Sequence, residues 1–233
     1  MPTFALDTST ASPALALVGD DGPVAELWLA PEPGAGRRVL EAVHGLLASV
    51  GATTADVDGI VVGVGPGGFT GLRIGLATAL GLGQALGVPV TGASSLEALA
   101  LGLAEAAPPG AVLVPVLDAR RRELFAAVYR PGPGDALEEL AAPQAIAPAD
   151  LAALLDGLGA PAVVGGDGIP AAGGALDGSG RTLLPLSARA ARLSAAALVA
   201  RVRAGGGLPA RPVYARLPDA EVNRRAAIAA AGS

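Results

Sequence analysis

A carboxylate and three hydroxyls stand together near the start of the chain, as Asp7, Thr8, Ser9 and Thr10. The apolar run before them predicts a first strand, and residues 13–18 predict its hairpin partner. A carboxylate at the end of a strand, followed by hydroxyls and backbone N–H groups, can hold a hydrated cation and phosphate oxygens. The same residues are equally typical of a side-chain-capped hairpin turn. The sequence leaves both interpretations open.

A second candidate is the segment GVGPGGFTGLRIG, residues 63–75, which leads directly into a helical pattern. A glycine-rich turn at a helix N-terminus presents free N–H groups and suits an anion. However, the segment holds no Lys and no acid, Pro66 removes one donor, and Phe69 suits an apolar groove better than a phosphate. We therefore favour a close-packing turn at a subunit contact over an anion cradle.

The residues that the chain lacks exclude several kinds of catalysis. Its 233 residues include no Cys, and all 16 basic residues are Arg. No lysine can serve a phosphate-binding loop or form a Schiff base, and no thiol can act as nucleophile, disulfide partner or metal ligand. His44 is the only histidine, so a site with several histidine ligands is impossible. We expect no metal site.

The order of the predicted elements indicates two similar α/β halves. It is β-β-β-α-β-α-β-α in the first half and approximately β-β-β-α-β-β-α in the second. The break at Pro108-Pro109-Gly110 predicts subdomains 1–107 and 108–233. Whether the final segment packs back on the first subdomain is left open. This order matches the actin, sugar-kinase and Hsp70-ATPase superfamily, whose duplicated actin-like (ribonuclease H-like) fold has a mixed sheet flanked by helices in each subdomain. The predicted helices are 37–50, 70–86, 95–106, 148–155 and 187–204.

Four motifs, LDTST, GPGGFTGLRIG, LDARRRELFAAVY and PVYARLPDA, occur in this order along the chain. Together they resemble the TsaB, or YeaZ-like, family of bacterial tRNA threonylcarbamoyladenosine biosynthesis proteins over essentially the whole chain. GPGGFTGLRIG is the distinctive motif. Gly68 stands where that family usually has Ser, and the usual His-Ser at the start of the first helix is replaced around Gly36 and Arg37. The role of a hydroxyl in the loop is therefore left open.

The resemblance implies a non-catalytic scaffold subunit. Members of the family join the transferase TsaD and the ATPase TsaE, and the complex places a threonylcarbamoyl group on the adenosine beside the anticodon of tRNAs that read ANN codons. The resemblance further implies a homodimer when TsaD is absent and an indirect or minor tRNA contact. The competing hypothesis is a nucleotide-dependent kinase or ATPase of the actin-like superfamily.

The helix that begins in the glycine-rich segment is the expected docking face. Its small residues recur every four positions and predict one nearly bare stripe, which allows another element to approach closely. With helix 37–50 it is expected to bind TsaD or a second copy, while Leu72, Leu76 and Leu80 bury against the protein's own sheet. The alternative is that the stripe itself faces that sheet. The expected interface residues are Leu40, Val43, His44, Gly67, Phe69, Thr70, Gly71, Arg73, Ile74, Gly75, Thr78 and Ala79.

The resemblance to the superfamily also implies a vestigial nucleotide site. Asp7, Thr8 and Ser9 would form its phosphate side, and Gly166 and Asp167 lie in GGDG, where superfamily members hold adenosine. A turn after a strand explains GGDG equally well. If the site is vestigial, Asp7→Ala leaves folding and partner binding intact. No cofactor is expected, although weak ATP or ADP binding is left open.

Arginines stand where active superfamily members have a glycine-containing phosphate hairpin, at residues 120–122. They can bind an anion, but pairing with acids on a neighbouring molecule is the favoured interpretation. The segment 181–225 carries nine Arg against two acids in a chain of net charge −5. This segment suits tRNA phosphates, an acidic partner or a solvated helix face.

No secretory signal is apparent at the N-terminus, and the uncharged run 74–96 is broken by Gly87 and Pro89. We therefore expect a cytoplasmic protein without a membrane span.

Overall fold

Two five-stranded mixed sheets form the framework of the chain in a computed structural model that describes residues 2–32 and 34–216. The first sheet has the order β3-β2-β1-β4-β5, and the second has the order β10-β9-β6-β7-β8. Read in reverse, the second order is β8-β7-β6-β9-β10, so each of its strands corresponds to the strand at the same position of the first sheet. In each sheet the first three strands are antiparallel and the last two join in parallel. The predicted duplicated fold of the ribonuclease H-like type is therefore confirmed. The strands are β1 (Thr3–Asp7), β2 (Ala14–Gly19), β3 (Gly22–Trp28), β4 (Gly59–Gly63), β5 (Val90–Ala93), β6 (Val112–Asp118), β7 (Leu124–Pro131), β8 (Leu137–Ile146), β9 (Ala162–Gly165) and β10 (Arg181–Leu183).

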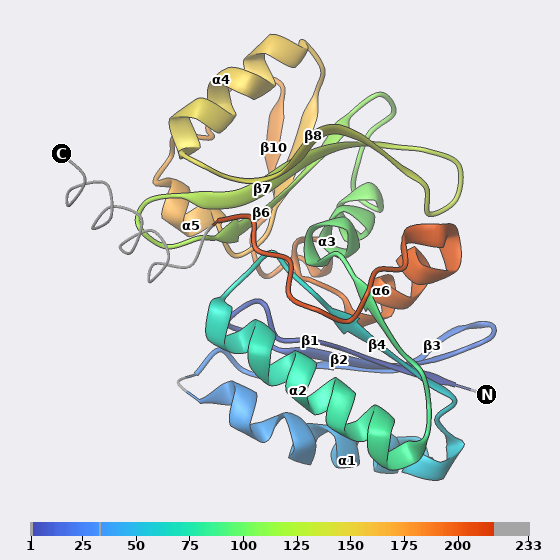
Figure 1. Cartoon of the computed structure of the whole chain (residues 1–233). Helices are drawn as coiled ribbons and strands as arrows, with labels where there is room; N and C mark the ends of the chain where they lie inside the picture. Colours follow the sequence, from blue (N-terminus) through green and yellow to red (C-terminus); the bar gives the residue numbers. More distant parts are fainter. Residues whose placement is uncertain (1, 33, 217–233) are drawn as a thin grey trace, which may run out of the picture.

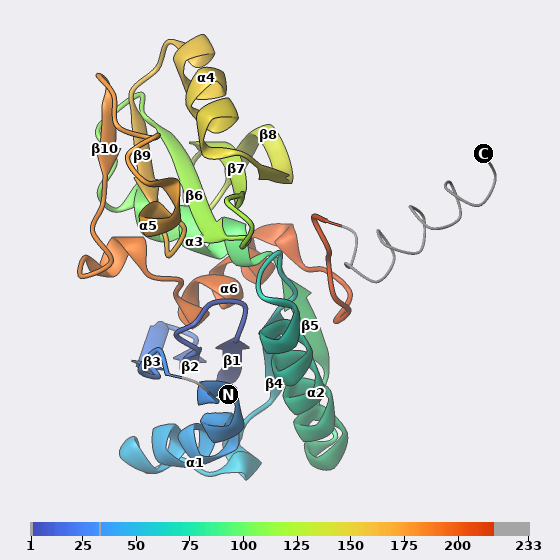
Figure 2. The ribbon, with the colours of Figure 1, turned by 90° about the vertical axis from the view of Figure 1, so that its left-hand side faces the viewer.

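Helices cover both faces of each sheet. Figure 1 shows α1 and α2 on the outer face of the first sheet, α4 on the outer face of the second, and α3 and α6 between the two sheets. Figure 2 shows the same layers from the side. None of the helices in the described part of the chain is long and apolar enough to cross a membrane. The helices are α1 (Val39–Ser49), α2 (Phe69–Leu86), α3 (Ser95–Ala104), α4 (Pro148–Leu158), α5 (Ile169–Ala172) and α6 (Ala195–Arg201), with short helical turns at Ala35–Arg38, Thr54–Asp56, Arg189–Ala191 and Val202–Gly206.

Large and small side chains alternate along the central strands of the first sheet. Phe4 and Leu6 in β1 pack into the core beneath α1 and α2, whereas Ala5 between them packs toward α6. In β2 the leucines and alanines alternate in the same way. Successive side chains of a strand point to opposite faces, so one face is bulky and the other nearly flat. The flat face allows α6 to lie close to the sheet.

The two inner helices are exchanged between the halves. α3 follows the first sheet in sequence but packs on β6, β7 and β9 of the second, whereas α6 follows the second sheet but packs on β1 and β2 of the first. The two helices also pack on each other. Neither half therefore completes its layers without a helix from the other.

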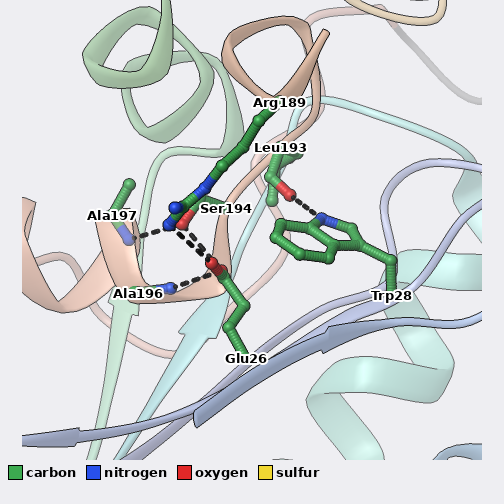
Figure 3. Close-up of polar contacts among 7 residues, drawn as sticks. All are labelled: Glu26, Trp28, Arg189, Leu193, Ser194, Ala196 and Ala197. Atoms are coloured by element: carbon green, nitrogen blue, oxygen red, sulfur yellow. Dashed lines mark hydrogen bonds and ion pairs between the residues drawn. The ribbon is translucent and has the colours of Figure 1, made fainter. Parts of the chain in front are cut away.

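Polar contacts from β3 fix the start of α6 (Figure 3). The Glu26 carboxylate accepts hydrogen bonds from Ser194 Oγ at 2.7 Å and from the Ala196 amide at 3.2 Å. The Trp28 indole N–H donates to the Leu193 carbonyl at 2.8 Å. Ser194 also caps the helix by accepting from the Ala197 amide. The helix predicted over 187–204 therefore begins only at the residue after Ser194.

The small-residue stripe of α2 faces the chain's own first sheet, contrary to the favoured expectation. Ala79 is 0% exposed, and Gly75 and Gly83 are buried. A Cβ added at Gly71 would lie 1.9 Å from the Thr8 carbonyl oxygen. The stripe thus permits close approach between α2 and the β1–β2 hairpin. The assignment of Gly75, Ala79 and Val43 to an exposed docking face was wrong because all three are buried, whereas Gly71 is half-buried.

The expected leucine ridge divides between core and surface. Leu72 and Leu76 are buried as expected, but Leu80 is 48% exposed.

Two glycine substitutions in α2 test this packing. Gly71→Ala should destabilise the fold by about 3 kcal/mol, because the new methyl group collides with rigid backbone. Gly81→Ala is the matched control, since a Cβ there meets nothing within 4 Å. It should stabilise the fold by about 1 kcal/mol through better helix propensity. Urea denaturation of both variants measures the difference, and equal effects would contradict the packing.

Candidate functional site

Asp7 lies at the end of β1, but its carboxylate is enclosed by protein. It is 1% exposed. Its Oδ1 accepts from the Ser9 amide at 2.6 Å, and its Oδ2 accepts from Ser95 Oγ at 2.6 Å. Ser95 Oγ in turn accepts from the Gly65 amide at 3.2 Å. Asp7 therefore ties the end of β1 to the start of α3 and to the glycine-rich turn, and both of its oxygens are engaged by groups of the same chain.

The surroundings of this carboxylate leave no room for a ligand. A Cβ added at Gly63 would come within 1.8 Å of Asp7 Oδ2. Burial raises the pKa of Asp7 above its ordinary value of 3.8, although the hydrogen bonds from Ser9 and Ser95 oppose this shift. The capped-turn interpretation of the first motif is the one that the geometry supports.

The glycine-rich turn packs against the loop between β1 and β2. The Gly68 amide donates to the Ser9 carbonyl at 2.7 Å. Thr8 Oγ1 donates to the Gly71 carbonyl at 2.7 Å. A Cβ at Gly67 would lie 2.4 Å from Ser9 Cβ. The segment is a close-packing turn, but the element that approaches it belongs to the same chain.

A cleft of about 630 Å³ lies between the two halves, beside these contacts. It brings Thr8 and Ser9 together with Asp167, as the expectation of a shared site requires, but leaves Asp7 outside its lining. The Asp118 amide donates to Asp167 Oδ1 at 3.1 Å, and burial raises the pKa of Asp167. The cleft is lined by Thr8, Ser9, Thr10, Ala11, Gly67, Gly68, Phe69, Gly71, Asp118, Ala119, Arg120, Arg121, Phe125, Asp167, Tyr214 and Arg216.

Gly166 allows the backbone after β9 to turn close to β6. Its φ is 129°, and a Cβ there would lie 2.0 Å from the Val116 carbonyl oxygen. Only glycine fits this conformation and this close approach between β9 and β6. The glycines of GGDG are therefore needed by the turn itself.

The β6–β7 turn lines one side of the cleft with Arg120 and Arg121, and it holds three consecutive arginines in the left-handed region. The φ angles of Arg120, Arg121 and Arg122 are 62°, 54° and 63°. Arg120 forms an ion pair with Asp118 of its own chain at 3.0 Å. The expected pairing of these arginines with acids on a neighbour stays a prediction.

The outer face of α1 and α2 carries the exposed part of the expected interface. Leu40 is 52% exposed, and His44 is exposed on the same helix. Leu80 on α2, at 48% exposure, belongs to this face although sequence reasoning assigned it to the core. Of the other expected residues, Phe69, Thr70 and Arg73 are exposed, and Gly67, Ile74 and Thr78 are half-buried.

The described residues contain no group of three or more His, Asp or Glu side chains placed to hold a metal. His44 lies on the helix layer outside the first sheet, and the cleft opens between the two sheets.

The duplicated sheets, the exchanged inner helices and the cleft between the halves define the class of actin-like, ribonuclease H-like proteins. Within this class, the sequence model of the family described as TsaD, tRNA N6-adenosine threonylcarbamoyltransferase, matches residues 36–164. The match covers more than half of the chain, and the chain belongs to this family.

Individual relatives agree with this membership. The chain is 35% identical to the tRNA threonylcarbamoyladenosine biosynthesis protein TsaB of Bacillus subtilis over 130 residues, which are 56% of this chain and 56% of that protein. It is 34% identical to TsaB of Escherichia coli over 130 residues, 56% of this chain and 55% of that protein. These matches span about half the length of the curated relatives. The structure of YeaZ from Pseudomonas aeruginosa is similar with a TM-score of 0.74 and 26% identity, covering 91% of this chain and 99% of that one.

Asp7→Ala should destabilise the fold, in contrast to the expectation for a vestigial site. The change leaves the buried Ser9 amide and the Ser95 hydroxyl without their acceptor, which costs about 1–3 kcal/mol. Asp21→Ala, in the exposed turn between β2 and β3, is the control and should change stability little. Urea denaturation at neutral pH measures both, and an unaltered Asp7→Ala midpoint would contradict the structural role.

The pH dependence of Asp7→Asn tests the same carboxyl. Burial raises the pKa of Asp7 in the folded state, so the folded protein binds this proton more tightly than the unfolded chain does. The stability contributed by this protonation is fully present below the ordinary value of 3.8 and is lost as pH rises through the folded-state pKa. The parent should therefore gain stability relative to Asp7→Asn as pH falls from neutral toward about 4. A constant difference across that range would argue against burial of the carboxyl.

Proposed function

We propose that the chain is a non-catalytic subunit in the formation of threonylcarbamoyladenosine in tRNA. In this role it binds a TsaD transferase, with TsaE as a further component of the complex. Membership of the TsaD family, the TsaB relatives in two bacteria and the YeaZ-like structure support this role.

The observation that carries the non-catalytic part of the proposal is the use of Asp7 as a structural acceptor. Its two oxygens are occupied by Ser9 and Ser95, and it stands outside the cleft. The chain has no lysine to replace it as a charged catalytic group near phosphate. Across the cleft, the β6–β7 turn presents arginine side chains in place of open backbone.

The docking surface that we propose is the outer face of α1 and α2, defined by Leu40, His44, Thr78 and Leu80. Leu40 and Leu80 are two large apolar side chains that are each about half exposed, on adjacent helices. Exposed leucines on paired helices suit a second helix pair of similar shape, because ridges of one pair fit grooves of the other. A family member of the same fold offers such a pair, so the same surface serves TsaD and, without TsaD, a second copy of this chain.

Leu80→Arg tests this surface. The residue is exposed, so the folded monomer should keep its stability, but an unpaired charge at the centre of an apolar contact should weaken TsaD binding by at least ~30-fold. Val24→Arg is the matched control, since Val24 is 54% exposed on β3, away from this surface. Titration calorimetry with TsaD from the same cells measures affinity, and sedimentation measures self-association.

Two outcomes would contradict the proposal. Equal TsaD affinity in Leu80→Arg and Val24→Arg would place the docking surface elsewhere. Sustained ATP hydrolysis or phosphoryl transfer by the purified chain alone would favour the competing kinase or ATPase hypothesis.

A further inference from the structure

The final described segment crosses from one half of the molecule to the other. Residues 207–216, which we call the strap, follow α6 and the helical turn Val202–Gly206. Ala210 packs on the core of the first half beneath α1 and α2. Ala215 packs on the core between α3 and the second sheet. The two parts of the strap therefore contact different halves.

Backbone hydrogen bonds hold the first part of the strap on the first half. Leu208 and Gly92 of β5 exchange two bonds, with amide nitrogen to carbonyl oxygen distances of 2.7 and 2.8 Å. The Val213 amide donates to the Val64 carbonyl at 2.8 Å. A Cβ added at Gly92 would lie 2.7 Å from the Pro209 carbonyl oxygen. This part of the strap is thus bonded to, and closely packed on, the backbone of the first sheet.

Side-chain contacts hold the remainder of the strap. Within the described residues, Val213 is the last residue of the strap that forms a backbone–backbone hydrogen bond. The Tyr214 ring then stacks on the Phe69 ring, with centroids 5.5 Å apart. These rings are 40% and 41% exposed, so the stack lies at the surface. Residues 214–216 can therefore move about Val213 while the bonds of the first part stay in place.

Arg216 fastens the strap to the second half. It forms an ion pair with Glu123 and donates to the Ala119 carbonyl, both at the β6–β7 turn. Its guanidinium lies 5.9 Å from the centroid of the Phe125 ring. The side chains of Arg216 and Glu123 are 27% and 37% exposed, so water reaches this ion pair. One partly solvated side chain therefore makes the polar attachment to the second half.

The fastened end of the strap forms part of the wall of the cleft between the halves. Tyr214 and Arg216 line the cleft, and so do Phe69, Ala119 and Phe125, which they contact. If residues 214–216 move away, the cleft widens and both phenylalanine rings lose a cover. On this side the cleft is bounded by contacts that can separate without disturbing either sheet.

We propose that the strap is a lid on the cleft, with a hinge at Val213 and Arg216 as its latch. The structure shows the closed state, in which residues 214–216 bridge the halves. In the open state residues 207–213 stay on the first sheet, and the released end uncovers Phe69, Phe125 and the way into the cleft. The lid is a property of this chain alone and does not depend on TsaD binding.

Cysteine alkylation tests the lid, because the chain contains no cysteine of its own. The rate at which iodoacetamide modifies a single introduced thiol reports how often its site opens. Ala215→Cys reports the moving end and Ala210→Cys the anchored part, since both alanines are half-buried. Adding Arg216→Gln should speed alkylation at position 215 about tenfold, because a charge-assisted hydrogen bond and an ion pair are lost. Alkylation at position 210 should change less than about twofold.

A third thiol reports the cleft itself. Ala119 lines the cleft and is 2% exposed, so Ala119→Cys should react slowly in the closed state. With Arg216→Gln its alkylation should accelerate by a factor similar to that at position 215. Arg130→Gln is the matched control, since it breaks an exposed ion pair with Glu138 away from the strap. It should leave all three rates near those of the parent.

Three results would overturn the proposal. Equal alkylation at position 215 in Arg216→Gln and Arg130→Gln would show that Arg216 is not the latch. An equal acceleration at positions 210 and 215 would show that the strap detaches as a whole, with no hinge at Val213. Acceleration at position 215 with an unchanged rate at position 119 would show that the strap end moves without opening the cleft.

Discussion

Each sheet of this protein has two apolar faces, and the chain must cover all four. It does so by placing the last helix of each half on the sheet of the other half. The inner faces are consequently buried within one shared core, in which α3 and α6 also pack on each other. Because each half supplies a layer of the other, the halves cannot separate without exposing apolar surface on both. The cleft therefore lies between two halves that share one core.

Polar groups at the borders of the halves reinforce this arrangement. Glu26 in β3 accepts from the start of α6, and Arg201 at the end of α6 donates to Glu97 in α3 at 3.0 Å. Asp7 similarly joins β1 to Ser95 at the start of α3. These carboxylates are partly or wholly buried and hydrogen-bonded, as burial of charge requires. A residue type that is typical of catalysis has here become an internal acceptor.

α2 connects the proposed docking surface on the outer helices with the cleft between the halves. Phe69 at its start lines the cleft, whereas Leu80, farther along, is exposed on the outer face. Its small residues hold it against the β1–β2 hairpin, so the helix has little freedom to shift. A partner on the outer face would therefore contact the same closely packed helix that borders the cleft.

The element order, the duplicated fold and the family resemblance could be predicted from the sequence, because they depend on periodicity, turn residues and motifs that are local in the chain. The sequence also identified Thr8, Ser9 and Asp167 as members of one cleft through that resemblance. It failed at Ala79 and Leu80, which are adjacent on α2, because this helix has only four polar side chains and its small and aliphatic residues occur on both the buried and the exposed side. The enclosure of Asp7 and the contact between Phe69 and Tyr214, 145 positions later, became visible only in the folded chain. Such contacts arise from how the layers stack, and no local pattern along the chain encodes that stacking.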